Sequence, residues 1–174
     1  MRILNHRRNV IAAALLLLPS ALQAAPPEKP AAAPKGKLDI RLLVTAEPNK
    51  VFRPVKGPDG KAALAEPVKV VPKGQQIAAV IFFKDCQPDA AGNCNVEIDL
   101  KGVNPQGVAF KDRKGADLWR NRRAPDPSVT QLGSSYMRLQ FEPKDAVGTY
   151  RIIAVAHDRN SGTDARAEAS FEVK

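Results

Sequence analysis

The chain has 174 residues, 44% of them hydrophobic and only 5% aromatic, and its 27 basic residues against 18 acidic ones give a net charge of +9. Such a length suits one domain with its own core. Such a charge favours contact with anionic surfaces, such as lipopolysaccharide, phospholipid headgroups or an acidic polysaccharide. The chain has two cysteines and two histidines. One histidine lies in the predicted signal, and the two cysteines are expected to pair, as argued below. Too few ligands then remain for an ordinary zinc or copper site, so we expect no metal and no cofactor.

Residues 1–24 are typical of a signal peptide. Arg2, Arg7 and Arg8 make its start positive, nine apolar residues follow at 10–18, and small residues permit cleavage after Ala24. A membrane anchor fits less well, because a spanning helix needs roughly 20 apolar residues. We therefore expect a periplasmic or secreted protein. Removal of the three basic residues would lower its net charge from +9 to +6, and nucleic acid is not an expected partner there.

Residues 25–36 are rich in proline and alanine and lack periodic apolar residues. Such a composition favours extended conformations, so this segment is predicted to be a flexible linker. Residues 37–174 are then predicted to form one domain. No later apolar stretch is long enough to predict a membrane-spanning segment.

Hydrophobicity in residues 37–174 varies with a period of two, which is typical of half-buried strands. The following segments show this period or are apolar throughout: 38–45, 77–83, 96–101, 137–141, 150–156 and 165–173. Residues 77–83 are continuously apolar, which predicts a central strand covered on both faces. Turn residues separate the segments, and the fold class predicted is all-β, an antiparallel immunoglobulin-like sandwich of about seven to nine strands.

Weaker signals complete the strand prediction. A short edge segment is expected at 67–72, and residues 108–110 are expected to pair back on 96–101 across a turn. Residues 48–67 and 111–129 carry no strand signal, so we expect both to be irregular.

One corner of the chain carries a specific resemblance. Asp145, Gly148 and Tyr150 stand in a pattern that resembles the tyrosine corner of immunoglobulin-like domains, where the tyrosine hydroxyl caps nearby backbone. The segment from 137 to 173 is also similar to exported bacterial immunoglobulin-like, fibronectin type III-like and macroglobulin-type β-sandwich modules. Ile152 stands where antibody domains carry their second core cysteine, so their inter-sheet disulfide is not expected. The resemblance implies a fold and transfers no site.

Cys86 and Cys94 flank a turn-forming stretch between two predicted strands. We expect a structural disulfide, which an exported protein would keep oxidised. A redox-active pair would have two intervening residues and a helix start, and neither is present. The nearby acidic and amide residues suggest calcium, but the spacing fails the helix-loop-helix pattern, so a solvated turn is expected; these residues are Asp85, Asp89, Asn93 and Asn95.

No catalytic residue is predicted, and we expect the protein not to be an enzyme. His157 lies beside Asp158 and near Ser161, but sequence neighbours on a strand point to opposite faces, so a triad is not expected. Glu97 and Asp99 could serve as an acid/base pair. Their alternation along one strand instead predicts a solvated sheet face.

The segment 111–123 holds the densest charge and the single tryptophan of the chain. Its candidate binding residues are Lys111, Arg113, Lys114, Trp119, Arg120, Arg122 and Arg123. Arginine grips carboxylate or phosphate in bidentate fashion, and tryptophan offers stacking area, so a recognition loop is one interpretation. In the other, Leu118 and Trp119 tuck under the sandwich and the charges are merely solvated.

Three functional hypotheses follow. The first is a non-enzymatic periplasmic binding or accessory module that contacts another envelope protein through a sheet face or an exposed edge strand. The second is a binding module for an anionic envelope polymer, such as lipopolysaccharide or an acidic glycan, through residues 111–123. The third is a small hydrolase or an inhibitor of one, which would require a deep pocket with perturbed ionisable groups.

Overall fold

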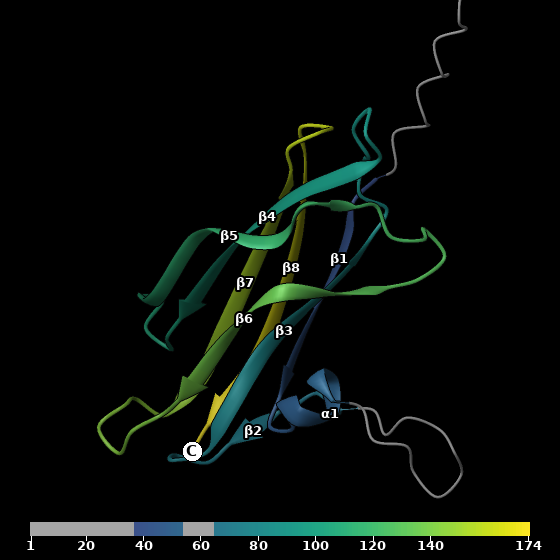
Figure 1. Ribbon diagram of the computed structural model, residues 1–174. Helices are drawn as coiled ribbons and strands as arrows, with labels where there is room; N and C mark the ends of the chain where they lie inside the picture. The colour runs from purple at the N-terminus through teal and green to yellow at the C-terminus, as the bar shows by residue number, and fades with distance from the viewer. Residues whose placement is uncertain (1–36, 54–64) are drawn as a thin grey trace, which may run out of the picture. The chain divides into compact units, whose positions relative to one another are not determined.

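The computed structural model describes residues 37–53 and 65–174, which form two β-sheets (Figure 1). The predicted signal peptide and linker lie outside the described residues. One sheet has three strands in the order β1-β3-β6, and the other has five in the order β2-β8-β7-β4-β5. An all-β sandwich is thus confirmed, with eight strands in the described residues.

The strands of the three-stranded sheet are β1 (Asp39–Thr45), β3 (Gln76–Lys84) and β6 (Gln131–Gln140). Those of the five-stranded sheet are β2 (Val70–Val71), β8 (Thr163–Val173), β7 (Gly148–Asp158), β4 (Asn93–Val103) and β5 (Ala109–Arg123). Neighbouring strands are antiparallel except β2 and β8, which pair in parallel through two residues each. The expectation of a wholly antiparallel sandwich is corrected at this one pair.

The core lies between the two sheets and follows from the period of two. Alternate residues of β4 are fully buried, as are those of β7, while their neighbours face outward. β3 is buried on both faces, as its continuous apolar run predicts: Ile81 belongs to the core cluster, whereas Ala78 and Val80 occupy the opposite face. β3 is also the central strand of its sheet, between β1 and β6.

Residues 48–67 are not wholly irregular. A short helix, α1 (Pro48–Phe52), begins with a proline in its first turn, where the missing N–H has no intrahelical partner to lose. The Phe52 ring lies 4.8 Å from the Tyr136 ring of β6, between centroids. Five residues are too few to show a helical period, so this helix could not be predicted from the hydrophobic pattern.

The tyrosine corner has the hydrogen bond that the resemblance implies. The Tyr150 hydroxyl donates to the Ala146 carbonyl at 2.9 Å, and the Tyr150 ring lies 4.7 Å from the Phe141 ring. Asp145 accepts the Glu142 amide at 2.7 Å, which closes the corner. Burial raises the pKa of Tyr150, and the negative charge of Asp145 adds to that rise.

Cys86 and Cys94 form a disulfide across the turn before β4. Asp158, which is buried at the end of β7, accepts the Gln87 amide at 2.7 Å and the Asn160 amide at 3.0 Å. Its carboxylate therefore joins the disulfide loop to the β7–β8 turn. In the same loop, the Asp89 carboxylate accepts the amides of Ala91 and Asn93, as in a solvated turn.

Candidate binding groove between strands β5 and β6

The basic segment 111–123 is part of a strand and not the irregular loop that the sequence predicted. β5 has 15 residues opposite the 11 of β4, and the pairing register shifts at four places. Gly115 at φ 58° and Asn121 at φ 51° lie at two of these shifts, in the left-handed conformation that one class of bulge uses. The bulges interrupt the period of two, and that is why the strand was missed.

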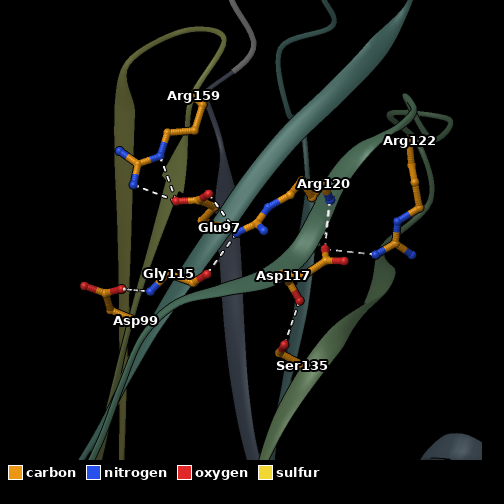
Figure 2. Close-up of polar contacts among 8 residues, drawn as sticks. All are labelled: Glu97, Asp99, Gly115, Asp117, Arg120, Arg122, Ser135 and Arg159. Carbon is orange, nitrogen blue, oxygen red and sulfur yellow. Dashed lines mark hydrogen bonds and ion pairs between the residues drawn. The ribbon is translucent and has the colours of Figure 1, made fainter.

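Carboxylates of β4 hold β5 in this bulged form (Figure 2). Asp99 accepts the Gly115 amide at 2.7 Å. Glu97 lies between two guanidinium groups, 2.8 Å from Arg120 and 2.7 Å from Arg159. The hydrogen bond from Arg159, with the positive charges of both arginines, lowers the pKa of Glu97 despite the opposing effect of desolvation.

Asp117 joins β5 to itself and to β6. Its carboxylate accepts the Arg120 amide at 2.9 Å and pairs with the Arg122 guanidinium at 3.1 Å. Its carbonyl accepts the Ser135 hydroxyl of β6 at 2.6 Å (Figure 2). A second serine of β6, Ser134, donates to the Leu118 carbonyl at 3.1 Å and also contacts Arg122.

Leu118 and Trp119 pack as the second interpretation of this segment expects. Leu118 is fully buried, and its side chain lies over Gly133, where a Cβ atom would collide with it. The Trp119 ring lies 5.4 Å from that of Phe83, and the Arg122 guanidinium stacks on it at 4.5 Å. The tryptophan is therefore a packing element whose exposed surface is already covered by an arginine.

A groove of about 620 Å³ lies between the two edge strands. Lys111, Asp112 and Arg113 line it from β5, and residues 134–138 line it from β6. The Lys111 ammonium donates to the Arg138 carbonyl at 3.2 Å. This contact and the Ser135–Asp117 hydrogen bond link the two strands, which belong to different sheets and share no backbone ladder.

The backbone of β6 directs alternate residues toward the groove. The Phe141 carbonyl accepts the Gly74 amide on the β3 side, whereas the Arg138 carbonyl accepts Lys111 on the β5 side. Since a strand alternates the direction of its backbone groups, Tyr136 shares the orientation of Arg138 and faces the groove. In the part of the chain that the structure describes, no backbone ladder covers this edge of β6. It therefore offers the donors and acceptors that an added strand would use.

His157 lies on the outer face of the five-stranded sheet. Its ring nitrogens lie 2.7 Å from the Asp164 carboxylate and 3.5 Å from that of Asp99. The Ser161 hydroxyl is bonded instead to Thr163 at 2.7 Å. These contacts differ from a nucleophile–base arrangement. Over residues 37–53 and 65–174, no group of three or more His, Cys, Asp or Glu side chains could hold a metal ion.

The structure disperses the seven candidate residues of segment 111–123. Lys111 and Arg113 line the groove, while Lys114 lines a separate hollow of about 320 Å³ on the outer sheet face. Arg120 and Arg122 are in ion pairs, Trp119 packs on the core, and the Arg123 carbonyl accepts the Trp119 indole N–H at 3.0 Å. The segment is therefore a strand and not a continuous loop, and its alternate residues point to opposite faces. That the seven residues bind a ligand stays a prediction.

Sequence reasoning missed the β6 side of the groove. Arg138 and Tyr136 are outward-facing residues of a strand whose inward positions were recognised. The basic residue Arg138, on the outward face of that alternation, was the one available signal. Nothing in the sequence indicates that β6 is an edge strand next to β5. Within the described residues, no helix is long and apolar enough to cross a membrane.

No protein-family model and no curated protein matches the chain. Among solved structures, it is similar to a Niemann-Pick type C2 protein from Japanese carpenter ant, with 10% identity, TM-score 0.44, and coverage of 83% of this chain and 98% of that one. It is also similar to the alkylpurine DNA glycosylase AlkC from Pseudomonas fluorescens, with 16% identity and TM-score 0.42, over 82% of this chain but only 32% of the glycosylase.

A third similar structure is the CARDB domain of the PF1109 protein from Pyrococcus furiosus, with 12% identity, TM-score 0.38, and coverage of 79% of this chain and 86% of that domain. Similarities at these identities and scores carry no information on function.

Proposed function

We propose that the protein is a non-enzymatic binding module, exported to the periplasm or secreted, that takes an extended segment of another envelope protein along the exposed edge of β6. The observation that supports this most directly is the groove of about 620 Å³ beside that edge. An edge strand with backbone groups directed into a groove suits strand addition, in which main-chain hydrogen bonds supply affinity.

The other edges of the sandwich are less suited to strand addition. β5 is the other groove wall, and its four register shifts and charged side chains oppose regular pairing. β8 is paired with β2 at its end, and β1 lies against β8. In contrast, β6 pairs with β3 in an unbroken register from Tyr136 to Gln140. A regular register keeps the outward groups at the spacing that a new strand needs.

The alternative, an anionic polymer bound through segment 111–123, has weaker support. Arg120 and Arg122 already pair with Glu97 and Asp117, and Trp119 lies beneath Arg122. A polymer would have to compete with these internal partners. The remaining cations point to two different surfaces, the groove and the outer sheet face.

A peptide selection tests the proposed function. Random nonapeptides displayed on phage are selected against the full chain, and binding of the enriched peptides is measured on two variants. Tyr136→Pro removes the groove-facing N–H without removing a ladder bond to β3, so we expect binding to be lost. Tyr136→Val removes the ring but keeps the N–H, so we expect binding to persist.

The controls keep this test decisive. Circular dichroism reports whether Tyr136→Pro is folded. If it is not, the test uses the amide chemical shifts of the wild-type chain on addition of peptide, and the largest changes are expected at residues 134–138. Enriched peptides that bind the proline variant unchanged, or that shift amides elsewhere, would contradict the proposal. So would a selection that enriches no peptide.

A further inference from the structure

We infer that the segment accepted by the groove is acidic, with carboxylates two positions apart that meet Lys111 and Arg113. This inference rests on the proposed function and names the chemistry of its partner. It starts from the charge of the groove, which three cations from two strands line with a single carboxylate: Lys111, Arg113, Arg138 and Asp112.

These cations have few partners within the protein. Among the described residues, none of the three lies within ion-pair distance of a carboxylate, although 11 such pairs are present elsewhere. Arg138 lies over the Tyr136 ring at 5.2 Å, and Lys111 donates to a neutral carbonyl. The acidic residues of β4 and β5 instead serve the bulged strand, as Asp117 does for Arg122. Among the described residues, the groove is therefore a place where three cations from two strands lie close together without an ion pair.

A hydrogen bond of Lys111 links the charge of the groove to strand addition. Its ammonium occupies the Arg138 carbonyl, which is an acceptor that the backbone of an added strand would take. Entry of that strand thus displaces the ammonium from its hydrogen bond. A released ammonium beside the incoming chain is best satisfied by a carboxylate on that chain, since charge-assisted hydrogen bonds are stronger than neutral ones. If the added segment were neutral, the displaced ammonium would have only water as a hydrogen-bond partner.

The spacing follows from strand geometry. Lys111 to Arg113 pair with β4 in continuous register, so this part of β5 is regular. Residues two apart on a strand lie about 7 Å apart on one face. An extended peptide repeats with the same distance, so acidic residues at positions i and i+2 face Lys111 and Arg113 together. Acidic residues at i and i+1 would point to opposite faces, and one of them would miss the cations.

The nonapeptides enriched against the wild-type chain test this inference. We expect Asp or Glu at i and i+2 among them. Replacement of both by Asn or Gln should weaken binding roughly tenfold at physiological salt, as expected for two exposed ion pairs. An isomer with the two acids adjacent should lose a similar factor. Arg113→Gln removes one of the two cations and should cut the preference for the acidic peptide by roughly threefold, while Arg41→Gln, a surface arginine on β1, should leave it unchanged.

The outcomes separate the two levels of the proposal. Enriched peptides that are neutral, bind with Tyr136 dependence and ignore Arg113→Gln would overturn the acidic preference and leave strand addition intact. Failure of every peptide to depend on Tyr136 would overturn strand addition itself. Lys111→Met gives an independent check: removal of the ammonium should strengthen binding of the Gln analogue relative to the acidic peptide, and an unchanged ratio would contradict the displacement step.

Discussion

The two strands that border the groove, β5 and β6, are both edges of their sheets, but their backbones differ in regularity and in the side chains that bind them. β5 is bulged, and side chains tie its backbone down: Asp99 takes the Gly115 amide and Asp117 takes the Arg120 amide. β6 is in regular register with β3 from Tyr136 to Gln140, and the flexible Lys111 side chain donates a hydrogen bond to its outward-facing backbone at Arg138. β5 is therefore protected against strand pairing by its own bulges and side chains, whereas the backbone of β6 at Arg138 is covered by a side-chain contact that can be displaced.

Loss of the Leu118 side chain, which holds β5 against β6, should lower the free energy of unfolding most. Leu118 is fully buried and seats β5 on Gly133 of β6. Leu118→Ala should lower the free energy of unfolding by about 2–5 kcal/mol because it removes buried methyl groups and leaves a cavity. Leu118→Met keeps the volume and should cost less than about 1.5 kcal/mol. Urea denaturation measures both, and an equal cost for the two would contradict a packing role.

A smaller effect is expected at the Gly115 bulge. The left-handed φ of 58° penalises a side chain, although an added Cβ would meet nothing nearer than the Glu97 carboxylate at 3.9 Å. Gly115→Ala should therefore destabilise the protein by about 1–2 kcal/mol through backbone strain alone. Gly115→Asn should cost less, because asparagine tolerates this conformation. If alanine and asparagine were equally tolerated, the bulge would not be strained as described.

The Glu97 pairs should show a pH dependence with a defined sign. The pKa of Glu97 lies below its ordinary value of 4.5 in the folded protein, chiefly because of the Arg159 hydrogen bond. Its stabilising contribution is therefore complete above that value and is lost as the pH falls through the folded-state pKa. The difference in unfolding free energy between wild type and Glu97→Gln should be present in full at about pH 7 and should shrink as the pH falls below the ordinary value of 4.5.

Glu168→Gln is the matched control for this prediction. Glu168 also pairs with two arginines, Arg151 and Arg166. It lies on β8, which β7 and β4 separate from β5 in the same sheet. Amide exchange in β5 should rise in Glu97→Gln and stay unchanged in Glu168→Gln. Equal effects of the two variants on β5 would show that Glu97 is an ordinary surface charge.

Most of the fold could be predicted from the sequence because most strands keep a strict period of two. The inward positions of β4, β6 and β7 were recognised from their alternation, and the corner at Tyr150 from its residue types. β5 could not be recognised. Four extra residues relative to β4 shift its apolar positions out of phase, so Leu118 and Ala116 are the only buried residues in a run of charges.

The candidate site was predictable only in part. Lys111 and Arg113 stood out as basic residues, but the sequence could not separate them from Arg120 and Arg122, which pair internally. That distinction depends on which carboxylates the bulges bring near. The β6 wall depends on how the two sheets are closed against each other, which local pattern does not specify.

Amide hydrogen exchange along β6 is the decisive measurement for strand addition at this edge. In the unliganded protein, the amides of Met137 and Leu139, which bond to β3, should exchange slowly, and those of Tyr136 and Arg138 should exchange rapidly. Addition of a selected acidic peptide should slow Tyr136 and Arg138 strongly and leave the amides of β1 unchanged. Slow exchange of Tyr136 and Arg138 without peptide, or rapid exchange of both in the saturated complex, would contradict strand addition at this edge.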